Sequence, residues 1–117
     1  MIKLYHNNRC SKSRGALELL NSTNENVEVF DLLKDSLTKE HLEEILLFLE
    51  MKPSELIRKK DTFFKENYRD KSYTEDEYLE IMLNNPRLIE RPILVKGKKA
   101  IIGRPTELIT DFLNNKY

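Results

Sequence analysis

The chain has 117 residues, which is enough for one hydrophobic core but too short for two independent ones. Hydrophobic residues make up 39% and charged residues 34%, with three Gly and four Pro, as is typical of a folded globular protein. Twenty Lys and Arg balance twenty Asp and Glu, so no overall field attracts nucleic acid or an anionic membrane, and we expect any anion site to be local.

The N-terminal part of the chain predicts a β-α-β unit. Residues 2–5 are apolar and β-favouring in alternation around Lys3, and the polar run 6–11 ends this strand. From residue 12 to residue 20 the apolar side chains follow helical spacing, and Ser11 or Ser13 is available to cap the first turn. Residues 27–30 form the next strand, and because such crossovers are right-handed we expect the two strands to be parallel.

The middle of the chain predicts helices. Thr38 is expected to cap a strongly amphipathic helix, and Pro53 begins a shorter helix that ends at about residue 58. Residues 59–73 mix charges and aromatic side chains without a clear period, and we predict this segment to be mostly irregular. Thr74 begins another helix, with Glu three residues later as a capping-box partner.

The C-terminal part predicts a β-hairpin and a last helix. Pro92 precedes the apolar run 93–95, Gly97 lies in the expected turn, and residues 100–102 form the second arm. Thr106 is expected to cap the final helix. The element order is therefore β-α-β, helices, β-β-α, which indicates an α/β fold with a small mixed sheet.

Cys10 is the only cysteine, so the chain cannot form an internal disulfide or a cysteine-based metal site by itself. It lies at or just before a predicted helix start, where backbone N–H groups without intrahelical partners favour a thiolate. The side chains of Arg9, Lys12 and Arg14 crowd the same loop, and Ser13 can donate a hydrogen bond to the sulfur. A buried, inert thiol is the alternative, but the polar neighbours favour a reactive one.

Other features exclude further classes of protein. His6 and His41 have no additional ligand at metal-binding spacing, and we predict no metal site; His41 is expected to be solvated. The N-terminus lacks the pattern of a signal peptide, and no stretch approaches the about 18 apolar residues of a membrane span. We expect a cytoplasmic protein.

A cysteine at the first strand-helix junction and a proline before the third strand are features of the thioredoxin-like fold. Four ordered stretches carry a closer resemblance, namely residues 5–14, 55–59, 85–93 and 102–105. Through them the chain resembles the glutaredoxin-coupled arsenate reductase family along nearly its whole length. The resemblance implies one domain over residues 1–117, with a thioredoxin-like core (1–31 and 85–117) and a helical insertion (37–84).

The resemblance also implies roles for single residues. Cys10 would be the nucleophile, and Arg58, Arg91 and Arg104 fall on the oxyanion-binding positions of the family. Arginine suits this task because its planar fork gives two hydrogen bonds to a tetrahedral oxyanion. Pro92 matches the proline that such proteins hold in the cis form, and the remaining supporting residues are His6, Ser13 and Arg14.

The implied reaction is the reduction of arsenate through a thiol-arsenate adduct on Cys10. Glutathione would be the co-substrate and glutaredoxin the partner, because the chain has no second thiol that could resolve a mixed disulfide. No bound cofactor is implied, and a neutral domain with a covered core predicts a monomer.

Two departures from the family pattern leave alternatives open. Asn8 stands where the family commonly has proline, and Ser11-Lys12 replaces the Gly-Thr that often follows the cysteine. A general glutathione-linked thiol oxidoreductase is one alternative. An Spx-type regulator that binds RNA polymerase is another, although its redox-sensing members usually carry Cys-x-x-Cys, and this chain has Ser13 at the second position.

Overall fold

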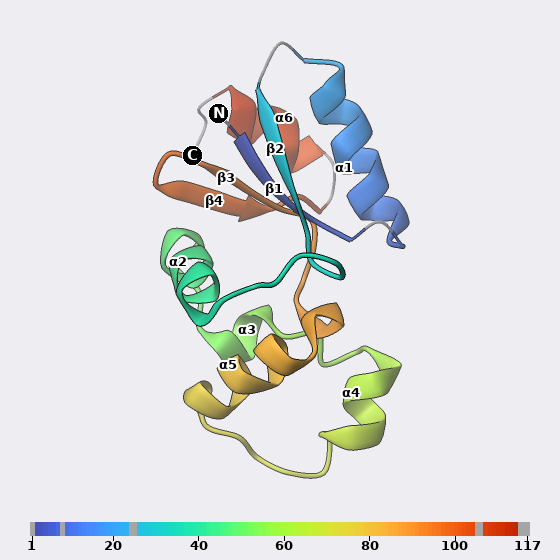
Figure 1. Cartoon of the computed structure of the whole chain (residues 1–117), viewed down its shortest axis with the longest axis vertical. Coiled ribbons are helices and arrows are strands. Elements are labelled where there is room, and N and C mark those ends of the chain that lie inside the picture. Colours follow the sequence, from blue (N-terminus) through green and yellow to red (C-terminus); the bar gives the residue numbers. More distant parts are fainter. Residues whose placement is uncertain (1, 8, 24–25, 105–106, 115–117) are drawn as a thin grey trace. The chain divides into compact units, whose positions relative to one another are not determined.

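The computed structural model describes residues 2–7, 9–23, 26–104 and 107–114. The contacts within the chain divide it into two units, which we treat separately (Figure 1). The sheet unit comprises Met1–Ser36 and Arg91–Tyr117, and the helical unit comprises Leu37–Glu90. Two residues of the sequence analysis lie outside the described residues. They are Thr106, the expected cap of the last helix, and Asn8, which stands where the family commonly has proline.

The sheet unit contains strands and helices in the order β-α-β followed by β-β-α. Its elements are β1 (Ile2–His6), α1 (Ser11–Asn21), β2 (Val27–Asp31), β3 (Ile93–Lys96), β4 (Lys99–Ile102) and α6 (Glu107–Leu113). Among the described residues the sheet has four strands in the order β2-β1-β3-β4. Strand β1 is parallel to β2 and antiparallel to β3, and β3 is antiparallel to β4. The predicted α/β fold with a mixed sheet is confirmed.

The core of the sheet unit lies between one face of the sheet and two helices. Alternate residues of a strand point to the same face, so Ile2 and Leu4 of β1 share a face with Leu94 of β3. This face packs against Ala16 and Leu20 of α1 and against Ile109 and Phe112 of α6. The packing fixes the start of α1 and the end of β4, which carry the candidate site.

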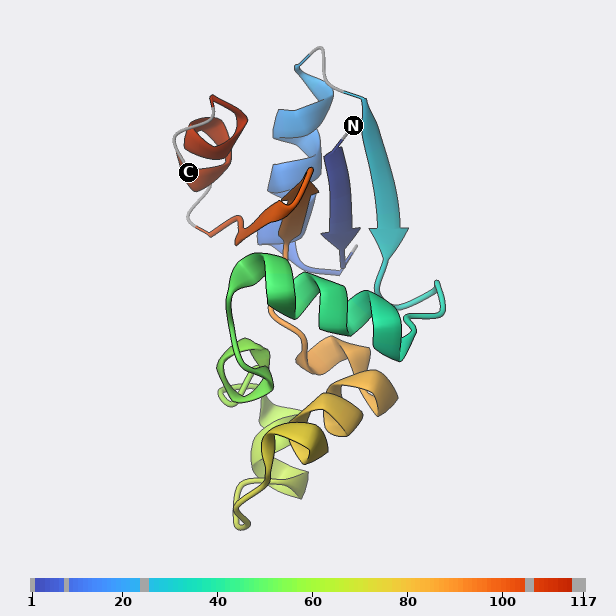
Figure 2. The same ribbon diagram turned by 90° about the vertical axis from the view of Figure 1, so that its left-hand side faces the viewer.

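The helical unit is built from short helices, four of them α-helices among its described residues (Figure 2). They are α2 (Lys39–Leu49), α3 (Pro53–Leu56), α4 (Thr62–Asn67) and α5 (Glu75–Asn84), followed by the 3-10 helix η1 (Pro86–Leu88). Helix α5 packs against α2, α3 and η1. Ile57 forms an isolated antiparallel bridge with Ile89, and both side chains are buried.

Both predicted threonine caps in the helical unit are confirmed. Thr74 Oγ1 accepts a hydrogen bond from the N–H of Glu77 at 3.2 Å, and Glu77 Oε1 accepts one from the N–H of Thr74 at 2.8 Å. Thr38 Oγ1 accepts from the N–H of His41 at 3.1 Å. The expectation that His41 is merely solvated is wrong, because its Nδ1 accepts from the N–H of Thr38 at 3.3 Å and completes a capping box.

The structure adds one element to the prediction and shortens another. Most of segment 59–73 is irregular, as predicted, but it contains the unpredicted helix α4, which begins after Asp61, whose carboxylate accepts from the N–H of Phe63 at 2.8 Å. Helix α3 ends at Leu56 instead of residue 58, since Ile57 turns to extended backbone and pairs with Ile89. Within the part of the chain that the structure describes, no helix is long and apolar enough to cross a membrane.

Candidate active site

Cys10 occupies the N-cap position of α1. Its backbone is extended, with φ −101° and ψ 122°, and its carbonyl accepts the first helical hydrogen bond, from the N–H of Arg14 at 3.0 Å. The helix start has no side-chain cap, so the expectation that Ser11 or Ser13 caps it is wrong. The position of Cys10 instead directs the N–H groups of the first turn toward its sulfur, and the thiol is half-buried.

Hydrogen bonds favour the thiolate form of Cys10. Partial burial raises the pKa of the Cys10 thiol, but this effect is outweighed by hydrogen bonds from the N–H of Ser13, the Arg91 side chain and the N–H of Lys12. The positive charge of Arg91 acts in the same direction, and the pKa of Cys10 is lowered. A lowered pKa increases the thiolate fraction at neutral pH, which is the form that acts as a nucleophile.

Asn7 organises the loop before Cys10 and was missed by the sequence analysis. Its side chain is buried, its Oδ1 accepts from the N–H of Arg9 at 2.9 Å, and its carbonyl accepts from the N–H of Cys10 at 3.0 Å. An Asx turn of this kind is what asparagine commonly forms, so the signal was present in the sequence. Asn7 therefore holds the turn that brings the chain from β1 to the start of α1.

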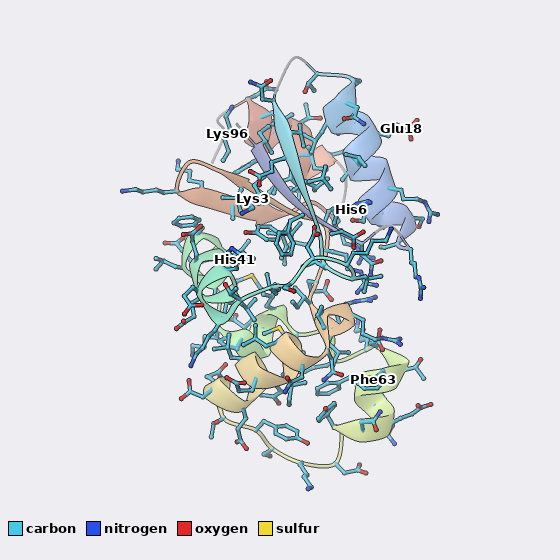
Figure 3. All side chains as sticks on the ribbon, in the orientation of Figure 1. Lys3, His6, Glu18, His41, Phe63 and Lys96 are labelled. Atoms are coloured by element: carbon cyan, nitrogen blue, oxygen red, sulfur yellow. The ribbon has the colours of Figure 1, made fainter. Side chains whose placement is uncertain are left out.

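Ser13 and His6 form a buried pair beneath this loop. Ser13 Oγ accepts from the N–H of Asn7 at 2.9 Å, and a hydrogen bond of 2.8 Å joins it to His6 Nδ1. His6 lies at the carboxyl end of β1, next to the start of α1 (Figure 3). The expected bond from the Ser13 hydroxyl to the sulfur is corrected, because that hydroxyl binds His6 and Asn7, and the backbone N–H of Ser13 binds the sulfur.

Arg91 and Arg104 come from two turns of the chain that are joined by hydrogen bonds. The N–H of Gly103 donates to the carbonyl of Pro92 at 2.8 Å, and Arg104 Nη1 donates to the carbonyl of Arg91 at 3.5 Å. The Arg91–Pro92 peptide bond is cis, as the resemblance implied. Arg91 is 9% exposed and contacts the Cys10 thiol, so the structure brings Cys10, Arg91 and Arg104 together.

Gly103 is required for this arrangement. A Cβ atom at this position would lie 3.0 Å from side-chain atoms of Ile109 and Leu94, both fully buried. A side chain at this position would press on these two buried residues, so glycine suits the close approach, and the next residue, Arg104, reaches the carbonyl of Arg91. Packing as well as charge thus accounts for the Gly-Arg pair at residues 103–104.

Arg58 lies in the helical unit. Its guanidinium forms ion pairs with Asp61 at 3.5 Å and with Glu90 at 3.4 Å. The backbone N–H of Arg58 donates to the carbonyl of Leu88 at 2.7 Å. Two carboxylates therefore hold the side chain of Arg58. Arg14 lies in the first turn of α1 on an exposed position.

The polar residues of the site do not form a metal centre. Among the described residues, no group of three or more His, Cys, Asp or Glu side chains could hold a metal ion. What the site offers is a thiol with a lowered pKa, several backbone N–H donors and two guanidinium groups. Such a combination suits a tetrahedral anion, which needs several donors and positive charge.

Comparison with known proteins agrees with this geometry. The sequence profile of the ArsC family matches residues 5–112. The chain belongs to the ArsC family. The matched region contains Cys10, the three candidate arginines and the buried pair of His6 and Ser13.

ArsC-family relatives cover nearly the whole chain. The uncharacterized protein YfgD of Escherichia coli K12 is 40% identical over 114 residues, which are 96% of each chain. An arsenate reductase of Neisseria meningitidis is 37% identical, over 92% of this chain and 94% of its own. The solved structure of an arsenate reductase from Vibrio cholerae is 34% identical and superimposes with a TM-score of 0.85, over 94% of this chain and 95% of that one. These likenesses agree with the thioredoxin-like fold that the element order predicted.

Proposed function

We propose that this protein reduces arsenate to arsenite, with Cys10 as the nucleophile and glutathione as the source of electrons. The observation that carries the proposal is the position of Cys10 at the N-cap of α1, where N–H groups and Arg91 lower the pKa of its thiol. The names of several ArsC-family relatives support arsenate as the substrate.

In the first step the Cys10 thiolate attacks the arsenic of bound arsenate. A sulfur-arsenic bond forms, one arsenic-oxygen bond breaks, and the departing oxygen takes up a proton and leaves as water. Arsenic remains in the +5 state, so no electrons are transferred in this step. Arg91 and Arg104 would stabilise the charge on the remaining oxygens, and the N–H groups at the start of α1 would assist them.

In the second step the thiolate of glutathione attacks the sulfur of Cys10. A disulfide bond forms, the sulfur-arsenic bond breaks, and its electron pair stays on arsenic, which becomes arsenite in the +3 state. The two sulfurs together lose two electrons. Because the sequence has no second cysteine, the mixed disulfide must be resolved by an outside thiol, and glutaredoxin is the proposed partner.

Arg58 belongs to this proposal only through the family resemblance. Its guanidinium is held by Asp61 and Glu90 within the helical unit. For Arg58 to bind an oxyanion it would have to share its five donors between these carboxylates and the substrate. Arg58→Ala should therefore affect arsenate binding less than Arg91→Ala does, which steady-state KM values for arsenate would show.

A coupled assay tests the proposal directly. Arsenate-dependent oxidation of NADPH is followed in the presence of glutathione, glutaredoxin and glutathione reductase, with wild-type protein, with Cys10→Ser and with Arg9→Ala. We expect turnover with the wild type and Arg9→Ala, because Arg9 is exposed and binds Asn7 through its backbone N–H, and none with Cys10→Ser.

Parallel reactions separate the proposal from its alternatives. A glutathionylated test peptide replaces arsenate in one set, and phosphate replaces it in another. Turnover with the glutathionylated peptide but not with arsenate would show a general thiol oxidoreductase and contradict the proposed substrate. Full activity of Cys10→Ser toward arsenate would contradict the proposed nucleophile.

A further inference from the structure

An open groove lies within the helical unit, and its lining includes no residue of the candidate active site. Helix α2, the loop that follows it and the start of α5 surround a volume of about 580 Å³. Its apolar lining includes Leu47, Met51 and Leu79. Figures 1 and 2 both show α2 and α5 as neighbours in this unit, and α5 packs against α2.

Leu47 lines the groove with an apolar side chain that is exposed to solvent. Its side chain is 71% exposed, whereas Leu42, Ile45 and Leu46 of the same helix are buried. A single exposed leucine is common on protein surfaces. Leu47 differs because it lines a hollow together with Leu79, whose side chain is only 5% exposed. An apolar side chain of another molecule could therefore be covered on several sides here.

Most of the charged residues that line the groove are acidic. Glu43, Glu50, Glu75 and Asp76 line it, against a single basic residue, Lys52. The helical unit as a whole has thirteen Asp and Glu against nine Lys and Arg, although the full chain is balanced. Among the described residues, no salt bridge involves Glu43 or Glu50.

Glu50 occupies a position that helix stability disfavours. It is the C-cap of α2, where the free carbonyl groups carry partial negative charge and a cation would be stabilising, yet the last turn has no basic residue. Its φ of 56° lies in the left-handed region, where glycine or asparagine is usual. Glu75 and Asp76, by contrast, are in the favourable first turn of α5. The end of α2 thus places a carboxylate where the helix already carries partial negative charge.

We propose that this groove is a docking site for a basic amphipathic segment of another protein, which places an apolar side chain against Leu47 and Leu79 and lysine or arginine side chains against Glu43 and Glu50. Charge complementarity selects this occupant, because an acidic or purely apolar segment would face uncompensated carboxylates. The site is independent of the proposed reductase activity.

A titration with defined peptides tests the proposal. The probe is an end-blocked helical peptide of repeated Leu-Lys-Lys-Leu. Two matched peptides replace all Leu with Gln or all Lys with Glu. Backbone amide NMR spectra of the full chain report the binding site, and calorimetry reports Kd. We expect the first peptide alone to bind, with shifted signals at Leu47, Glu50 and Leu79, and with affinity that falls as salt is added.

Variants with matched controls complete the test. Leu47→Gln, Glu43→Lys and Glu50→Lys should each weaken binding about five-fold or more, since each removes a contact or reverses a charge at the groove. Leu33→Gln and Glu66→Lys make the same chemical changes at other exposed positions and should leave Kd within about two-fold of the wild type.

Four results would overturn the proposal. They are the absence of binding, shifts confined to other surfaces, equal weakening by the control variants, and tight binding of the glutamine or glutamate peptide. Sedimentation velocity gives one more outcome, because a concentration-dependent dimer that Leu47→Gln abolishes would make a second copy of this chain the occupant instead.

Discussion

Replacing Gly103 by alanine tests how the sheet unit holds Arg104. The added Cβ would lie 3.0 Å from Cδ1 and Cγ1 of Ile109 and 3.0 Å from Cδ1 of Leu94. Both neighbours are completely buried, so neither can move into solvent to make room. Overpacking of this kind costs about 1–3 kcal/mol. We expect the free energy of unfolding to fall by that amount.

Gly15 provides a matched control for this substitution. It lies inside α1, and a Cβ there would meet nothing within 4 Å. Gly15→Ala should therefore raise stability by about 0.5–1 kcal/mol, because alanine loses less backbone entropy in a helix. The same glycine-to-alanine substitution should therefore lower the free energy of unfolding at Gly103 and raise it at Gly15.

A double-mutant cycle identifies the clash itself. Ile109→Val removes the Cδ1 methyl group that the new Cβ meets, and alone it should cost about 0.5–1.5 kcal/mol. Combined with Gly103→Ala, the two losses should be less than additive, with a coupling of about 0.5 kcal/mol or more. Urea unfolding followed by circular dichroism measures all four proteins. Strict additivity, or a Gly103→Ala protein as stable as the wild type, would refute the packing argument.

Three further substitutions probe the rest of the molecule. Arg91→Ala should raise the pKa of Cys10, because it removes a hydrogen bond and a positive charge from the thiolate, whereas Arg9→Ala should not; the pH dependence of iodoacetamide alkylation decides between them. Asn7→Ala should cost about 0.5–1.5 kcal/mol in thermal unfolding, since the partly buried N–H of Arg9 loses its acceptor. Asp61→Asn keeps an oxygen to cap α4 but loses the charge that binds two arginines. Burial raises the pKa of Asp61, but hydrogen bonds and these arginines outweigh it and lower the pKa. The native carboxylate therefore adds stability above pH ~4 that is lost as the pH falls through its folded pKa. The deficit of Asp61→Asn should be about 1 kcal/mol at pH 7 and should disappear in acid; a deficit that does not change with pH would contradict the charge argument.

Local signals in the sequence were enough to predict much of the fold. The Thr74 capping box and the cap at Thr38 depend on side chains within three residues of each other, so spacing alone reveals them. Helix α4 was not predicted, because its aromatic residues lack helical spacing and its start depends on Asp61. That carboxylate also accepts a hydrogen bond of 3.0 Å from the guanidinium of Arg87, which lies 26 positions away in the sequence. A local sequence pattern does not indicate such a contact.

The candidate site likewise combines features that the sequence predicts with features that depend on tertiary packing. The sequence placed Cys10 at a strand-helix junction, and the family resemblance supplied the arginines. Sequence spacing could not show that Arg91 contacts the thiol or that Ser13 turns its hydroxyl away from it, since both depend on how β1, α1 and β3 pack. The reason for Gly103 was equally hidden, because its neighbour Leu94 comes from a different element of the core.

The single hydroxyl proton of Ser13 determines which nitrogen of His6 carries hydrogen. Ser13 Oγ already accepts from the N–H of Asn7, and among the described contacts of this hydroxyl His6 Nδ1 is the available acceptor. When Nδ1 receives that proton, the neutral imidazole carries its hydrogen on Nε2. Its Nε2 is buried and has no hydrogen-bond partner among the described residues. When the Ser13 hydroxyl instead accepts from an Nδ1–H group, Nε2 is an acceptor, so the direction of this one hydrogen bond decides whether the buried Nε2 is an unpaired donor or an unpaired acceptor among the described residues.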